Sequence, residues 1–464
     1  MEIDKSKFRK FTSGYTFKVL LLFFLVLLLL IPLAMIRGLI DDRSRTANSA
    51  EQGIMEAWGS ELVAAGPMIA VPGLRTVETR TRSERDGERI NIEKVAFTLV
   101  ITPQELAIDA DFKTEIRKRG IFSVPLFYGD LVLSGSFNPA QAVSSLSANE
   151  EIFWDQAELV VLLSSQKGIR RIDRATLNGQ DLFFQPDNMG LKIDLVSNLP
   201  SYQEALYSAS TTGIAAALPE SSSGESTFDI SIAIQGGRMV RFAPIGMNTR
   251  SDIRADWASP SFQGAYLPGS SSITDSGFEA AWDISYLSRG IPLFWKIEVD
   301  GKNRYFSNYL FGVDFFRAID TYSLNTRAVK YAILFLIVPF LTLFLLEIFT
   351  KKKIHPVPYL LSGIANVIFY LLLLSFSEQM PFYLAYTIAA LAVSVLLTLY
   401  SRSLLPSWNR SGYMGFVVTI SYILLYAVLN AESYALLIGS VGAFAVVALV
   451  MFITRKLNWY GTEE

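Results

Sequence analysis

Residues 19–36 read VLLLFFLVLLLLIPLAMI, eighteen positions without a charged side chain. As an α-helix this stretch is about 27 Å long, close to the thickness of the hydrocarbon core of a bilayer. The basic residues before it are Lys5, Lys7, Arg9, Lys10 and Lys18. Because Lys and Arg resist translocation, we predict a membrane anchor at 19–36 with residues 1–18 in the cytoplasm and the following residues outside.

A cleaved signal peptide also has a basic start and an apolar middle, but small residues must follow at the cleavage site. Here Ile36 is followed by Arg37, and the first run of small residues, 47–49, lies well downstream. The sequence therefore favours a retained anchor.

Composition excludes several classes of chemistry. The 464 residues include no cysteine, so no disulfide or thiolate chemistry is possible, and His355 is the single histidine. Most metal sites and every serine-histidine triad that does not use His355 are thereby removed. The formal net charge of −2 gives no electrostatic footprint for nucleic acid. We expect no cofactor, no metal and no nucleic-acid partner.

A second membrane block begins near residue 331, and each of its apolar stretches is long enough to cross a bilayer. The stretches are 331–349, 359–376, 382–400, 412–429 and 434–453. Basic connectors at 351–353, 402–410 and 455–456 alternate with connectors that carry Glu378 or Glu432. This alternation predicts six spans with both termini in the cytoplasm, including a tail at 454–464.

Between the anchor and the second span, residues 41–327 read as a mostly β external region. Ile54, Trp58 and Leu62 recur every fourth position and predict a helical stalk, which Gly66–Pro67 is expected to end. A period of two then predicts strands at 76–82, 89–101, 105–112, 131–137, 157–164 and 228–234. Asp86–Gly87 supplies a hairpin turn between the first two. The polar segment 208–226 predicts a loop or a seam between two lobes.

The last two membrane hairpins are similar to each other. Glu378 and Glu432 both stand at a hairpin tip, and Ala385 matches Gly439 in the helix that follows. Small residues at every fourth position let membrane helices approach closely, so we interpret the repeat as packing.

Short motifs run in a fixed order along almost the whole chain. They include IPLAMIRGLI at 31–40, RGIF at 119–122, SPSFQG at 259–264, GFEAAW at 277–282, FGVD at 311–314, His355-Pro356 and ALLIG at 435–439. In this order they resemble the CreD (Cet) family of bacterial inner-membrane proteins. The resemblance implies a place in the response regulon of a two-component system and a role in cell-envelope integrity, colicin tolerance and the β-lactam response.

The sequence departs from the family pattern at four positions. Pro358 stands where Gln is expected and Pro339 where Thr is usual, and Ser433 and Asn458 replace acids. Pro339 predicts a kink in the second span. The resemblance assigns no catalytic residue.

Ser164 and Lys167 spell Ser-x-x-Lys, the opening of the penicillin-recognising serine enzymes. That motif should open a helix, whereas Ser164 ends a predicted strand, and the chain contains no Lys-Thr-Gly partner. The pair is more typical of a strand end followed by a turn.

Four residues of the membrane block are candidate functional positions. Glu347 is a carboxylate near hydrocarbon, which usually faces a partner or water, although pairing at the interface is favoured one turn before Lys351. His355 titrates near neutral pH, but its place before Pro356 favours a turn residue. Glu378 and Glu432 are expected to be solvated, or to mark where the external domain meets the bundle.

Aromatic residues in the external region form a further candidate surface. They are Trp257, Phe262, Phe278, Trp282 and Trp295. Packing in a core explains them more simply than a ligand groove does.

We predict a membrane protein with a six-helix transmembrane bundle, one N-terminal anchor plus five C-terminal spans. A large mostly β (α+β) periplasmic domain at 41–327 is inserted between spans 1 and 2. Its predicted role is envelope integrity under stress, through binding a protein or lipid partner rather than by catalysis, with the lipid bilayer as the partner that the spans require.

Two alternatives stay open. A transporter or lipid-handling protein needs polar residues around one cavity, for which Glu347, Asn366, Ser375 and Ser394 are few. An envelope hydrolase would have to use a Ser-Lys or carboxylate pair.

Overall fold

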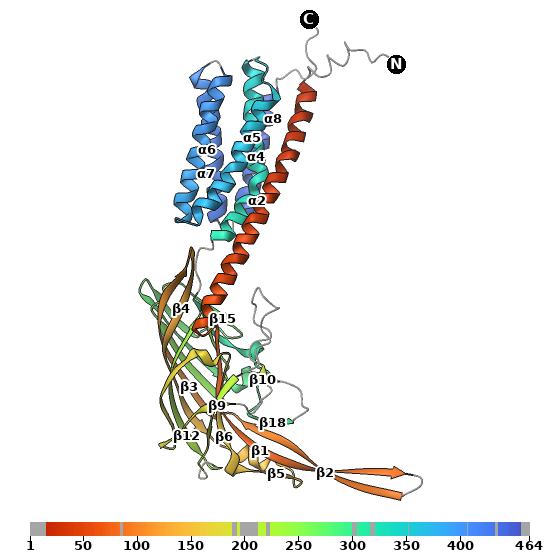
Figure 1. Ribbon diagram of the computed structural model, residues 1–464, viewed down its shortest axis with the longest axis vertical. Coiled ribbons are helices and arrows are strands. Elements are labelled where there is room, and N and C mark those ends of the chain that lie inside the picture. The colour runs from red at the N-terminus through yellow and green to blue at the C-terminus, as the bar shows by residue number, and fades with distance from the viewer. Residues whose placement is uncertain are drawn as a thin grey trace. The chain divides into compact units, whose positions relative to one another are not determined.

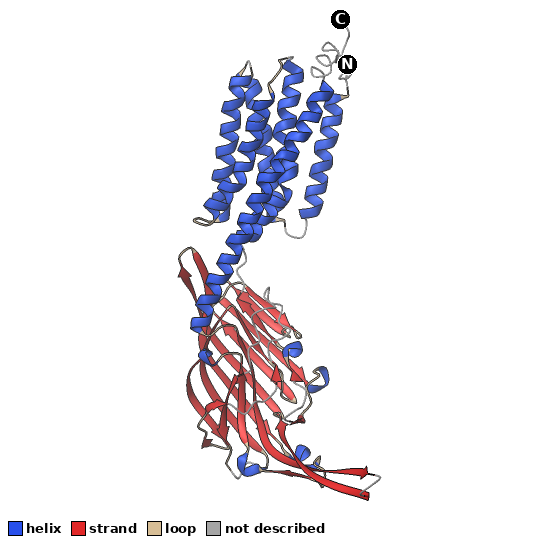
Figure 2. Ribbon diagram, turned by 45° about the vertical axis from the view of Figure 1, so that its right-hand side comes forward, coloured by secondary structure: helices blue, strands red, loops and turns tan. Residues whose placement is uncertain are grey.

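The computed structural model describes residues 15–83, 87–187, 193–194, 212–219, 223–298, 304–315, 321–350, 352–405, 407–431 and 435–455. The chain divides into two compact units. One comprises Met1–Asn48 with Ile319–Glu464, and the other comprises Ser49–Ala318. The first unit is helical and the second, called the β domain below, is built of strands (Figures 1 and 2).

The helical unit contains apolar helices at all six predicted positions. They are α2 (Tyr15–Trp58), α4 (Thr321–Thr350), α5 (Pro356–Ser377), α6 (Phe382–Leu404), α7 (Trp408–Asn430) and α8 (Ala435–Thr454). Within the described part of the chain, α2 and α4 to α7 are long and apolar enough to cross a membrane. Helix α8 carries no charged residue over its 20 positions. The predicted class, a membrane protein with a β-rich domain between its first and second apolar helices, is confirmed.

Helix α2 continues past the predicted span without a break and ends at Trp58. The N–H groups of Gly59 and Ser60 both donate to the Met55 carbonyl oxygen, at 2.8 and 2.7 Å. Gly59 has φ +152° and Ser60 φ +60°, backbone conformations that stop a helix. The prediction that the stalk runs to Gly66–Pro67 is therefore wrong, because the left-handed turn ends the helix earlier and Gly66–Pro67 lies inside the first strand.

The β domain contains two large sheets, together with a short helix, α3 (Ala140–Ser144), and a separate pair, β10 (Ile193–Asp194) with β19 (Arg304–Tyr305). The strands of the larger sheet are β1 (Leu62–Ser83), β2 (Gly87–Ile101), β5 (Glu150–Ile152), β6 (Glu158–Leu163), β9 (Gln185–Asp187), β11 (Thr212–Ala217), β13 (Met239–Phe242), β15 (Pro260–Gly264), β18 (Phe294–Glu298) and β20 (Phe311–Phe315). Their order is β15-β20-β13-β1-β6-β11-β9, with β2 and β5 also on β1 and β18 on β2.

The second sheet has the order β16-β17-β14-β3-β4-β12-β7-β8. Its strands are β3 (Glu105–Arg119), β4 (Phe122–Phe137), β7 (Ile169–Leu177), β8 (Gln180–Asp181), β12 (Ser226–Gly237), β14 (Asn248–Ala255), β16 (Ser270–Thr274) and β17 (Gly277–Ser285). All six predicted strands fall on observed ones, and the predicted first hairpin pairs Thr76 with Lys94 and Ser83 with Gly87.

The segment predicted as a loop or seam, 208–226, is only partly described, since 208–211 and 220–222 lie outside the described residues. Its part at 212–217 is not a loop but strand β11, paired between β6 and β9. Gly213, Ile214 and Ala215 are buried there, so small and apolar residues override the polar character of the neighbouring sequence.

The two sheets pack against each other around one core. Phe315 of β20 contacts Phe112 of β3 and Phe127 of β4, with ring centroids 6.4 and 5.0 Å apart. Leu62, on β1, belongs to the same cluster of buried residues. The β domain is therefore a two-layer structure.

Candidate functional site

A buried ion pair joins three helices of the bundle. Glu347, near the end of α4, is 4 % exposed and accepts a hydrogen bond from Lys18 of α2. The other carboxylate oxygen of Glu347 accepts from the Tyr359 hydroxyl of α5 at 2.8 Å. Lys18 Nζ also donates to the Ile354 carbonyl oxygen at 2.8 Å and lies 5.5 Å from the Tyr359 ring centroid. The carboxylate is thus fully partnered, which offsets the cost of burying it.

A second polar cluster joins the same three helices at the opposite end of α4. Tyr322, in the first turn of α4, donates to the Glu378 carboxylate at 3.3 Å, and Arg43 Nε of α2 lies 3.7 Å from it. Asn325 donates to the Ser377 hydroxyl at 2.9 Å. Tyr322 and Glu347 are 25 positions apart, about 37 Å along a helix. Glu347 and Glu378 therefore hold α2, α4 and α5 together near both ends.

A third polar group lies midway along the bundle, where Pro339 interrupts α4. Proline has no N–H, so the carbonyl oxygen four residues earlier, that of Phe335, loses its helical partner. Asn366 of α5 supplies the missing donor at 3.0 Å, and the Tyr422 hydroxyl of α7 donates to the Asn366 amide oxygen at 3.0 Å. The hydrogen bond that Pro339 removes from α4 is thus replaced by one from a side chain of the neighbouring helix α5.

Aromatic rings surround this amide. Phe369 lies 4.4 Å from Tyr422 and 5.5 Å from Tyr386 between ring centroids, and the Tyr386 hydroxyl donates to the Tyr422 carbonyl oxygen at 2.6 Å. Among the described residues of the bundle, Glu347 is the only buried charged side chain. The middle of the bundle is therefore polar but uncharged, an arrangement suited to fixing helices against one another.

The other predicted positions of the membrane block lie outside these clusters. His355 is exposed and caps α5, where its Nδ1 accepts from the Val357 N–H at 3.4 Å. Glu432 lies outside the described residues. Sequence reasoning missed that Lys18 pairs with Glu347. The available signal was an acid and a base each at the boundary of an apolar span.

Ser164 and Lys167 do not form a catalytic pair in the structure. The Ser164 hydroxyl donates to the Glu61 carbonyl oxygen at 2.7 Å and accepts from the Val63 N–H at 2.9 Å. Lys167 Nζ donates to the Glu56 carbonyl oxygen at 3.2 Å. Both side chains form hydrogen bonds with backbone atoms of the segment that joins α2 to β1.

The predicted aromatic residues of the β domain belong largely to its core. Phe262 and Trp282 are brought together, with ring centroids 5.8 Å apart, and Trp282 is 3 % exposed. Trp257 packs edge-on against Phe315, at 6.3 Å. Trp295 contacts a different ring, that of Phe306.

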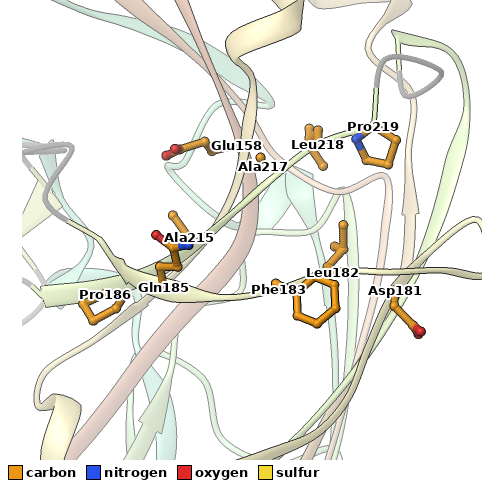
Figure 3. Close-up of a pocket in the computed structure, with 10 residues that line it drawn as sticks. All are labelled: Glu158, Asp181, Leu182, Phe183, Gln185, Pro186, Ala215, Ala217, Leu218 and Pro219. Carbon is orange, nitrogen blue, oxygen red and sulfur yellow. The ribbon is translucent and has the colours of Figure 1, made fainter.

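A cavity of about 670 Å³ lies at the β9 edge of the larger sheet (Figure 3). Ten residues line it: Glu158, Asp181, Leu182, Phe183, Gln185, Pro186, Ala215, Ala217, Leu218 and Pro219. Phe183 is 84 % exposed, and the two carboxylates give the cavity an acidic character that disfavours anions.

An apolar N-terminal helix, an inserted two-sheet domain and a block of apolar C-terminal helices together define a multi-pass membrane protein with a large domain outside the bilayer. The chain belongs to the family of the inner membrane protein CreD, whose family model matches residues 14–460. It is similar to the inner membrane protein CreD of Escherichia coli (strain K12), with 29 % identity over 451 residues, 97 % of this chain and 94 % of that relative. The resemblance predicted from the short motifs is confirmed.

Proposed function

We propose that this protein maintains the integrity of the cell envelope as part of a stress-response regulon, by binding an envelope protein or a lipid through its β domain rather than by catalysis. Residues 41–327 are periplasmic and both termini are cytoplasmic. Colicin tolerance and the β-lactam response follow from the state of the envelope.

The observation that carries the proposal is the insertion of the β domain between two apolar helices. α2 leads directly into β1, and α4 begins at Thr321, six positions after β20 ends at Phe315. A domain tethered at both ends stays close to the bilayer, which raises its effective concentration toward partners there. Membership of an inner-membrane family supports the same role.

The distribution of charge supports the orientation. Lys352 and Lys353 lie in the connector between α4 and α5, and Arg402 and Arg410 lie in the helix turns on either side of the connector between α6 and α7, whereas Glu378 follows α5 directly. Short loops rich in Lys and Arg stay in the cytoplasm.

Cysteine labelling tests the orientation directly, because the chain contains no cysteine of its own. Ser272 on β16 and Ser403 at the end of α6 are both exposed. The label is applied to cells whose outer membrane is permeabilised and whose inner membrane is intact. We expect an impermeant maleimide to label Ser272→Cys at once and Ser403→Cys only after lysis. The reverse pattern would reject the orientation and the proposed role together.

Complementation tests the role. A strain that lacks the protein should release a periplasmic enzyme under detergent or β-lactam stress, and the wild-type chain should prevent the release. The double variant Ser164→Ala/Lys167→Ala should complement fully if the protein acts by binding. Loss of complementation by this variant at normal protein levels would favour the hydrolase alternative.

The partner is tested by photo-crosslinking in intact cells from Trp257, which is half-buried in the β domain. The proposal expects the same envelope protein or lipid to be captured under stress in repeated experiments, and not from a control position at Ser403.

A further inference from the structure

Among the described residues, one buried arginine of the β domain has no hydrogen-bond partner on its guanidinium group. Arg289 follows the 3₁₀ turn Tyr286–Ser288 after β17 and is 6 % exposed. Its Nε, Nη1 and Nη2 atoms all lack a hydrogen-bond partner in the described structure. Such a group is rare, because an unpaired buried cation costs several kcal/mol.

The charge is not relieved by loss of the proton. Burial lowers the pKa of Arg289 to about 10, with a small opposing effect of the Tyr266 phenol. At neutral pH the guanidinium therefore stays protonated. It keeps five N–H donors in a planar fork that suits the two oxygens of a carboxylate or a phosphate.

The surroundings of Arg289 are phenolic and apolar. The Tyr266 hydroxyl donates to the Ser288 carbonyl oxygen at 2.9 Å, which ties the Tyr266 turn to the Arg289 turn. A Cβ at Gly290 would lie 2.2 Å from the Tyr309 hydroxyl, so glycine is needed there to admit this second phenol. The single hydroxyl proton of Tyr266 is used in its bond to Ser288, whereas the Tyr309 hydroxyl can donate to an oxyanion. Tyr266 interacts electrostatically with both Tyr309 and Arg289, and neither phenol neutralises the arginine as a carboxylate would.

Exposed leucines flank the two turns. Leu267, next to Tyr266, is 72 % exposed, and Leu287, two positions before Arg289, is 80 % exposed. Large apolar side chains exposed beside a polar site indicate a ligand with an apolar part.

From this arrangement we propose that Arg289 and Tyr309, with Tyr266 fixing the Arg289 turn, form an oxyanion-binding site for a phosphate or carboxylate group carried on an apolar body. The site goes beyond the proposed function and holds for either orientation of the chain. It is distinct from the acidic cavity beside β9.

The test is titration calorimetry on the full-length protein in nanodiscs of zwitterionic phosphatidylcholine. The probes are inorganic phosphate, acetate and dihexanoyl phosphatidylglycerol below its micelle concentration. We expect wild type to bind at least one probe, and Arg289→Gln to lose at least tenfold in affinity for it. Arg254→Gln, which removes an exposed arginine on β14, is the matched control and should bind as wild type does.

The arms identify the source of the oxyanion. Tighter binding of the short lipid than of inorganic phosphate, with competition between them, assigns a lipid headgroup, whereas equal binding would contradict the part of the proposal that gives the ligand an apolar body. Preference for acetate assigns a carboxylate.

Arg289→Lys keeps the charge but not the fork, so it should fold like wild type and bind more weakly. The proposal is overturned if Arg289→Gln and Arg289→Lys both bind as wild type does, or if wild type binds none of the three probes up to 50 mM for the ions.

Discussion

Single residues in the bundle matter through their partners. Glu347 is tolerated among apolar helices because Lys18 and Tyr359 satisfy both of its oxygens. A carboxylate that loses its base in such a site is buried without a counter-charge, which destabilises the bundle.

Lys18→Met should therefore destabilise the bundle by about 3 kcal/mol, because it leaves Glu347 buried without a counter-charge. Lys18→Met combined with Glu347→Gln should recover most of this loss, since no charge remains and Gln still accepts from Tyr359. Unfolding in a mixed-detergent titration measures both. Glu378→Gln is the control: its side chain is 11 % exposed, but Arg43, 3.7 Å away, is exposed and the Gln amide oxygen can still accept from Tyr322, so this substitution should cost less than about 1 kcal/mol. If the effects of Lys18→Met and Glu347→Gln on the free energy of unfolding were additive, the pairing of Lys18 with Glu347 would be contradicted.

Glu61 predicts a pH dependence of the β domain. Burial raises the pKa of the Glu61 carboxyl, and Arg238 and Arg241 oppose this only in part. A group whose pKa is raised by folding contributes stability below its unfolded pKa and loses that contribution as the pH rises through the folded value. Glu61→Gln stays neutral, so its stability relative to wild type should increase from pH 4 to pH 7. Denaturant unfolding at several pH values measures the difference.

The control for this prediction is Glu279→Gln, an exposed position on β17, whose difference from wild type should not change with pH. Burial also raises the pKa of Asp314, and the Asp314 carboxylate adds to the raised pKa of Glu61, so the difference between wild type and Glu61→Gln includes this interaction. A Glu61→Gln curve parallel to that of wild type would refute the argument.

At the scale of elements, Pro339 and Asn366 act as a pair across α4 and α5. Asn366→Leu should destabilise the bundle by about 1 kcal/mol, because the Phe335 carbonyl oxygen is left without a donor. Pro339→Ala restores an N–H at the position that can bond Phe335 within α4. In the Pro339→Ala background, Asn366→Leu should therefore cost clearly less. The double-mutant cycle measures this coupling, and a coupling of zero would show that Asn366 acts elsewhere.

The helices could be predicted from the sequence, whereas their partners could not. A run such as 19–36 is constrained by the bilayer at every position, so hydropathy alone locates it. Lys18 and Glu347 are 329 positions apart, and no period in the sequence links them. The predicted end of the helical stalk is wrong because a single left-handed turn at Gly59 and Ser60 determines where α2 ends. Arg289 carries no local signal at all, since burial of a turn residue depends on which turns the sheets bring together.

At the scale of the whole molecule, the two units have different physical sources of stability. The core of the β domain contains residues such as Phe112 and Phe315, and the hydrophobic effect stabilises their burial. The core of the helical unit contains residues such as Phe369 and Tyr422, where packing and a few hydrogen bonds act within lipid. No residue belongs to both of these clusters in the described structure.

Separate cores predict two unfolding transitions in the full-length protein. Lys18→Met should lower the midpoint of only one of them, the transition of the helical unit. Ser164→Ala removes the hydroxyl that bonds Glu61 and Val63, so it should cost about 1 kcal/mol and lower only the other midpoint. Differential scanning calorimetry in nanodiscs, with circular dichroism to assign each transition to helix or strand, separates the two effects. If either substitution shifted both transitions equally, the units would unfold as one, because α2, which runs through both, would transmit the loss from one core to the other.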